Sequence, residues 1–144
     1  MSIDAADRAG VAHFVRVCGA GVVATVGADA EPQAAYVGLT ATDDGTLVFD
    51  AADDSRKVAN IAERPRVAVT VTGAETTVQF EGRARIARDE ERWRLGETYC
   101  ERFPGSRALD VGFAVVVVDV AWVRVYDAAS RPPHVTESTW SPRG

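Results

Sequence analysis

Short stretches rich in β-branched residues, separated by turn residues, constrain the fold of this chain more than any other feature. Residues 46–50 (TLVFD) follow Asp44-Gly45, a pair that favours a tight hairpin turn. Valines alternate along residues 66–72, as in a strand with one buried face. Strands joined by such short turns pair antiparallel, because parallel neighbours need a long crossover. The expected strands are residues 21–26, 33–42, 46–50, 66–72, 76–87, 112–120 and 122–126.

Helical features interrupt this series of strands. Apolar residues in the N-terminal segment recur at the spacing of one helical face, with Ser2 or Asp4 as a possible cap. Pro65 prevents the second helix from continuing. The expected helices are residues 4–19, 55–63 and 88–103. We therefore predict a mainly β protein with short helices (α+β), built on a small antiparallel barrel. Gly82, inside an expected strand, indicates a bulge or a close approach of another backbone.

The length of 144 residues is that of one domain. We expect the domain to span residues 1–129 and residues 130–144, rich in Pro, Ser and Thr, to form a poorly packed tail. The net charge of −5 argues against nucleic acid as a partner. We predict a cytoplasmic protein that does not enter a membrane. The N-terminus is acidic, no apolar run is long enough to span a membrane, and the sequence has only two cysteines.

Two adjacent cations, Arg56 and Lys57, begin the helix expected at residues 55–63. A helix N-terminus carries a partial positive charge and unpaired N–H groups, so cations are unfavourable there. A bound anion would remove the conflict by accepting hydrogen bonds from those N–H groups and pairing with both cations. The alternative is that Asp53 and Asp54 neutralise the two cations on a solvated loop, and the charge pattern by itself leaves both interpretations open.

The chain lacks the usual motifs of self-sufficient catalysis. No serine or cysteine stands in a nucleophile motif, and the two histidines, His13 and His134, lie far apart in the sequence. Neither histidine has a second ligand at metal-binding spacing, so we expect no metal. Phosphate loops of the GxxxxGK and GxGxxG types are also missing. Any redox chemistry would therefore depend on a bound cofactor.

Several segments occur together in an order that identifies a family. EPQAAYVGL is followed by DDGTLVFDAADDSRKVANI, then by RPRVAVTV and TVQFEGRARI. This succession resembles the pyridoxamine 5'-phosphate oxidase-related family of FMN-binding split β-barrels, over roughly residues 21–126. The resemblance implies a homodimeric flavoprotein, an oxidoreductase with FMN bound at the subunit interface and a small-molecule substrate. The large apolar side chains Phe113, Trp122 and Tyr126 independently suggest a dimer interface.

The resemblance also implies roles for individual residues. The SRK segment of the family holds the FMN phosphate, and the strand through residues 36–38 lies against the isoalloxazine ring. Thr77 stands where family members often carry a glutamine that reaches the flavin, and Gln79 lies on the same face, so either is a candidate for that contact. No catalytic residue is implied. The implied cofactor-binding residues are Tyr36, Val37, Gly38, Asp50, Ala51, Ser55, Arg56, Lys57, Thr77 and Gln79.

Two departures from the family pattern affect the expected activity. Ala35 stands where the true oxidase has an arginine that helps to hold FMN, which predicts weaker binding or a deazaflavin cofactor. The tail TESTWSPRG, which contains Trp140 and Arg143, lacks the spaced basic pair that binds pyridoxamine phosphate, so we do not expect that substrate. The alternatives are a deazaflavin-dependent reductase and a non-catalytic flavin- or haem-binding module, with His134 as the tail ligand for haem.

Overall fold

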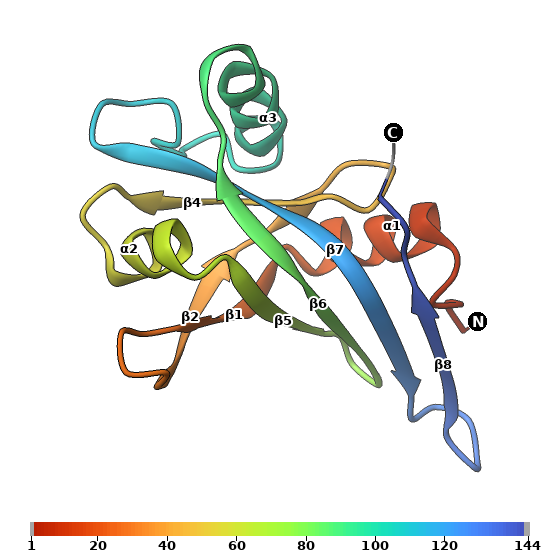
Figure 1. Cartoon of the computed structure of the whole chain (residues 1–144). Coiled ribbons are helices and arrows are strands. Elements are labelled where there is room, and N and C mark those ends of the chain that lie inside the picture. The colour runs from red at the N-terminus through yellow and green to blue at the C-terminus, as the bar shows by residue number, and fades with distance from the viewer. Residues whose placement is uncertain (1, 143–144) are drawn as a thin grey trace.

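The computed structural model describes residues 2–142, which form one curled antiparallel sheet and three helices (Figure 1). The helices are α1 (Arg8–Cys18), α2 (Arg56–Glu63) and α3 (Asp89–Arg102). The strands are β1 (Ala20–Val26), β2 (Pro32–Gly38), β3 (Thr40–Ala41), β4 (Leu47–Ala52), β5 (Arg66–Thr72), β6 (Thr76–Ile86), β7 (Phe113–Asp127) and β8 (His134–Thr139). Their order is β2-β1-β5-β6-β7-β4-β3, with β8 also paired to β7. The predicted mainly β, antiparallel architecture is confirmed.

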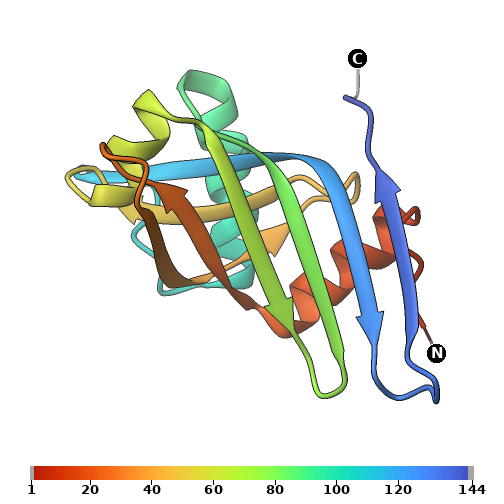
Figure 2. The ribbon, with the colours of Figure 1, turned by 60° about the horizontal axis from the view of Figure 1, so that its bottom comes forward.

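β7 is one long strand that changes partner halfway along. Its first half pairs with β4 and its second half pairs with β8, while β6 runs beside both halves. The two parts of the sheet diverge from this strand, which produces a half-barrel (Figures 1 and 2). The expectation of separate strands at residues 112–120 and 122–126 was wrong, because the irregularity between them is a bulge and does not end the strand.

Gly82 lies at that bulge, as the sequence predicted. The register between β6 and β7 shifts between Glu81 and Gly82. A Cβ atom on Gly82 would lie 2.3 Å from the carbonyl oxygen of Asp119, too close for any side chain. The close approach of the β7 backbone is therefore the physical reason for glycine at this position.

The core fills the inner face of the sheet. Phe49 and Phe80 are among its largest fully buried side chains, and Val11 and Val15 of α1 pack with them. The consecutive valines 115–118 are all buried. Successive strand side chains point to opposite faces, so both faces of β7 are covered here, and α3 packs against β4 and β7 on one of them. Within residues 2–142, no helix is both long enough and apolar enough to cross a membrane.

Two local boundaries differ from the sequence-based expectation. α1 begins at Arg8 with Asp7 as its N-cap, whose carboxylate accepts from Gly10 N at 3.1 Å, instead of beginning near Ser2 or Asp4. The expected strand 33–42 is divided at Leu39 into β2 and β3, because β2 pairs with β1 whereas β3 pairs with β4.

The prediction of a poorly packed tail was wrong for residues 134–140. β8 pairs with β7 from Asp127↔His134 to Trp122↔Thr139, and Trp140 is only 4% exposed. The Trp140 indole donates from Nε1 to the carbonyl oxygen of Ala5 at 2.8 Å. The N-terminal segment thus supplies the surface that covers the tail, a long-range contact that local composition does not reveal. Arg143 lies outside the described residues.

Candidate functional site

Ser55, Arg56 and Lys57 form the start of α2, immediately after β4. Ser55 is the N-cap, and its Oγ accepts from Val58 N at 3.4 Å. The first turn contains no acidic residue. Within residues 2–142, Arg56 and Lys57 form no ion pair or side-chain hydrogen bond, and the exposed Asp53 and Asp54 do not approach them as ion-pair partners. Two cations and the free N–H groups of a helix terminus therefore meet without an internal counter-charge.

Lys57 is also the only lysine in the sequence, in which Lys and Arg together number 16. The chain thus uses arginine at every other cationic position. A lysine differs from an arginine in carrying a compact, strongly hydrated point charge with three donors. Its position beside a helix N-terminus is suited to a phosphate group, which accepts from several donors at once.

Asp50 and Gly38 lie on opposite sides of the gap between β4 and β2, and α3 connects them. The Tyr99 hydroxyl lies 3.1 Å from the carbonyl oxygen of Gly38 and 3.2 Å from Oδ1 of Asp50. Ser106 Oγ donates to the other oxygen of Asp50 at 3.3 Å. Both carboxylate oxygens of Asp50 are therefore engaged by the protein, so this side chain holds α3 and the following loop in place.

Tyr99 and Ser106 were not among the residues predicted from the sequence. Burial, followed by the nearby charge of Asp50, raises the pKa of Tyr99 well above its ordinary value. The side chain stays neutral and serves as a donor. A tyrosine on the buried side of α3 needs a partner for its hydroxyl, so the sequence could have marked Tyr99 as a hydrogen-bonding residue. No local pattern identifies its partners on β2 and β4.

The remaining residues predicted on β2 and β4 differ in burial and in the groups that they could offer to a ligand. Tyr36 points away from the core and is 78% exposed, whereas Val37 packs against the core. A Cβ atom on Gly38 would lie 2.9 Å from the Tyr99 hydroxyl, so only a bare backbone fits there. Ala51 is buried with 7% exposure. Gly38 and Ala51 can therefore offer little more than backbone to a ligand.

Thr77 and Gln79 are not brought together with the cations of α2 in one chain. α2 leads into β5 at Arg66, which pairs with Arg83 on β6. Thr77 lies six residues before Arg83, or ~20 Å along the strand. α2 and the turn between β5 and β6 accordingly lie at opposite ends of the sheet (Figures 1 and 2).

The outer face of the sheet carries Gln79 and the exposed apolar side chains. The pairing registers place Tyr36, Val22, Thr70, Gln79 and Arg124 in one row across five strands. Val22 is 41% exposed, Tyr126 38% and Val135 39%. A groove of about 1290 Å³ also opens on this face, and its lining does not include Arg56 or Lys57. In one chain Arg56 is exposed and Lys57 is half-buried.

Comparison with known proteins agrees with this architecture. The haem-binding protein from Mycobacterium smegmatis superposes with a TM-score of 0.78 at 20% identity, over 96% of this chain and 59% of that one. A pyridoxamine 5'-phosphate oxidase-related, FMN-binding protein from Nostoc punctiforme gives 0.66 at 13% identity, over 92% and 93%. An F420 reductase gives 0.64 at 21% identity, over 77% and 93%. These likenesses establish the split-barrel fold.

No curated protein matches the sequence significantly. The sequence profile of pyridoxamine 5'-phosphate oxidase, in contrast, matches residues 9–127, which include every strand from β1 to β7 and the start of α2. This span covers most of the chain and contains all the segments on which the resemblance was based. The chain therefore belongs to the pyridoxamine 5'-phosphate oxidase family of split β-barrel proteins.

Proposed function

We propose that this protein is an FMN-binding oxidoreductase in which Arg56 and Lys57 hold the cofactor phosphate. The observation that supports it is the pair of cations at the start of α2, which have no ion-pair partner among residues 2–142. Ser55 would add its hydroxyl, and the backbone at Gly38 and Ala51 would border the rest of the cofactor. When bound, FMN supplies hydride transfer, and the protein supplies anchoring and orientation. The substrate is a small molecule other than pyridoxamine phosphate.

The proposal includes a homodimer. Thr77 lies ~20 Å and Gln79 ~13 Å along β6 from Arg83, which pairs with the residue at which β5 begins after α2. We infer that they reach a cofactor bound by the partner subunit and not one bound by their own. Tyr36, Val22 and Tyr126, exposed on the same face, would be buried in such a contact. The exposure of Arg56 in one chain supports the same arrangement.

A deazaflavin cofactor is the second candidate. Ala35 contributes no cation beside β2, and a solved relative is an F420 reductase. A haem-binding module is supported only by the likeness to the haem-binding protein and by the exposed position of His134 on β8. If His134→Ala abolished a Soret band in purified protein, the haem alternative would replace the flavin proposal.

Titration of apo-protein with FMN, followed by flavin fluorescence, tests the proposal. Arg56→Ala combined with Lys57→Ala removes two charge-assisted contacts, each worth about 1.5–3 kcal/mol, so binding should weaken by about 3–6 kcal/mol. The matched control is Arg88→Ala with Arg131→Ala, which removes the same charge from two exposed positions without ion pairs in residues 2–142. Equal FMN affinity in the two double variants would refute the phosphate site. Binding of F420 but not FMN by the wild-type protein would favour the deazaflavin.

A further inference from the structure

Arg66 and Arg83 lie directly opposite each other on the outer face of the sheet. They are Cα partners in the antiparallel pairing of β5 and β6, and both are exposed. The Cβ atoms of such partners lie ~4.5–5.5 Å apart, and like charges in this arrangement destabilise a sheet. Neither guanidinium has an ion pair or hydrogen bond within residues 2–142. The two cations therefore oppose each other without an internal counter-charge.

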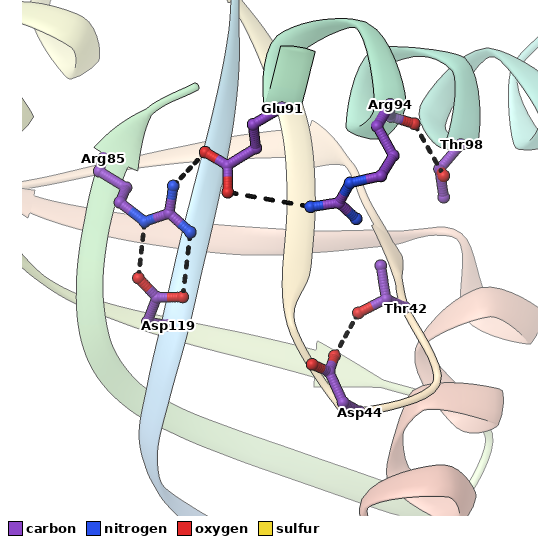
Figure 3. A network of polar contacts seen from close by, with 7 residues as sticks. All are labelled: Thr42, Asp44, Arg85, Glu91, Arg94, Thr98 and Asp119. Atoms are coloured by element: carbon purple, nitrogen blue, oxygen red, sulfur yellow. Dashed lines mark hydrogen bonds and ion pairs between the residues drawn. The ribbon is translucent and has the colours of Figure 1, made fainter. Parts of the chain in front are cut away.

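The acid directly opposite Arg83 on β7 pairs with another arginine. Asp119 on β7 is the direct register partner of Arg83, yet its carboxylate binds Arg85, at 2.8 Å from Nε and 3.4 Å from Nη2. Arg85 also pairs with Glu91 of α3, as Figure 3 shows. These two acids raise the pKa of the Arg85 guanidinium. Arg85 thus has two acidic partners, whereas Arg83, two residues earlier on the same face, has no ion-pair partner among residues 2–142.

The same contrast holds farther along the sheet. Arg124 on β7 pairs with Glu137 of β8 at 3.0 Å. Glu81 is the acid closest to Arg83 along β6 on this face, but it is exposed and forms no ion pair with either arginine. Among residues 2–142, Arg85 and Arg124 of the outer face are therefore paired with acids, whereas Arg66 and Arg83, at the end of β5 and β6 nearest α2, are not.

Arg66 and Arg83 both border a groove on the outer face of the sheet. Arg66 and Arg83 line the groove of about 1290 Å³ together with Ala24, Val26, Pro32 and Ala68. These four residues have short side chains, and the acids Glu81 and Asp119 also line the groove. Two planar guanidinium forks that face one cavity can bind an oxyanion through several parallel N–H···O bonds.

We propose that Arg66 and Arg83 form a second anion-binding site, which takes the phosphate or carboxylate group of a small molecule. It is separate from the start of α2, because the eight residues of that helix place about 12 Å between its first turn and the chain that enters β5. The site does not depend on which cofactor binds at Arg56 and Lys57.

The test uses the full chain with Arg56→Ala and Lys57→Ala, so that only the second site responds. Inorganic phosphate and succinate are titrated by calorimetry at low ionic strength, with sodium chloride at matched ionic strength as the control for screening. Arg66→Gln or Arg83→Gln should weaken binding of the preferred anion at least tenfold, while Arg88→Gln, outside the groove, should leave it unchanged. Preference for phosphate or for succinate identifies the anion class.

The same variants give an independent readout of stability. Without added anion, removing either opposed arginine should raise the melting temperature by roughly 1–5 °C, because a like-charge contact is relieved. Anion binding that survives both glutamine variants, or that sodium chloride reproduces, would overturn the proposal. A change in molar mass by light scattering, with anion binding unaffected, would instead assign the two arginines to a contact between copies of the chain and would also overturn it.

Discussion

The hydroxyl oxygen of Tyr99 lies 3.2 Å from Oδ1 of Asp50 and so connects α3 to the end of β4. The same hydroxyl lies 3.1 Å from the carbonyl oxygen of Gly38, at the end of β2. β2 and β4 do not pair with each other, because the sheet is open between them. One tyrosine therefore bridges the opening beside which α2 begins, and its loss should affect both stability and the geometry of the candidate site.

Tyr99→Phe should destabilise the protein by about 1–3 kcal/mol, because partly buried polar groups of Gly38 and Asp50 lose a partner. Tyr36→Phe is the matched control, since the Tyr36 side chain is 78% exposed and should tolerate the change within about 0.5 kcal/mol. Urea denaturation of both variants measures the difference. Equal stability of Tyr99→Phe and Tyr36→Phe would show that the bridge contributes nothing.

The same tyrosine predicts a loss of stability in alkaline solution. Burial and Asp50 raise the pKa of Tyr99 above its ordinary value of 10.0, so the folded state holds the phenolic proton more tightly than the unfolded state. The resulting stabilisation is complete below about pH 10 and is lost as pH rises above that value. Wild-type protein should therefore lose stability more steeply than Tyr99→Phe between pH 9.5 and about 11, as measured by melting temperature. Parallel curves would contradict the role of this proton.

Gly82→Ala should destabilise the sheet by about 1–3 kcal/mol or more, because the new Cβ would lie 2.3 Å from a backbone oxygen of β7 that cannot move freely. Gly105→Ala is the control, since a Cβ there meets no atom within 4 Å and should be neutral or slightly stabilising. Thermal unfolding of the two variants gives the comparison. A Gly82→Ala protein as stable as Gly105→Ala would exclude the close approach.

Sequence patterns predicted the parts of this structure that depend on local chemistry. The alternating valines of β5 and the Asp44-Gly45 turn each reflect contacts within one hairpin. The bulge at Gly82 was predicted from a glycine inside a strand, although its partner on β7 lies beyond α3 in the sequence. The start of α2 was equally local, since a cap and two cations follow one another directly. The order of these segments then identified the family, which no single motif would have done.

Patterns failed where the partner is distant in sequence. Trp140 is covered by the N-terminal segment, and its hydrogen bond to Ala5 joins residues that are 135 positions apart in the sequence. Tyr99 meets Gly38 and Asp50 only because the sheet curls and brings the ends of β2 and β4 to the same side of α3. The pairing of Arg66 with Arg83 depends on the register of two strands, which alternation of side chains alone does not determine.

Trp140→Ala should cost about 3–5 kcal/mol, because a buried indole and its hydrogen bond to the N-terminal segment are both lost. Arg8 also lies over this ring, 4.8 Å from its centroid. Trp93→Ala is the matched control, since Trp93 is 56% exposed on α3 and its removal should change stability little. Chemical denaturation separates the two, and similar losses in both variants would argue against an anchored C-terminal strand.

Lys57 provides a direct chemical test because it is the only lysine of the chain. An amine-reactive acetylating reagent should modify Lys57 and the α-amino group, and peptide mass spectrometry distinguishes them. FMN at ten times its dissociation constant should slow acetylation of Lys57 about tenfold, since about one molecule in eleven remains free, and should leave the α-amino group unaffected. Riboflavin, which lacks the phosphate, should protect far less. If fluorescence reported bound FMN but Lys57 were acetylated at the rate of the free protein, the flavin would bind away from the α2 cations and the proposed phosphate site would be refuted.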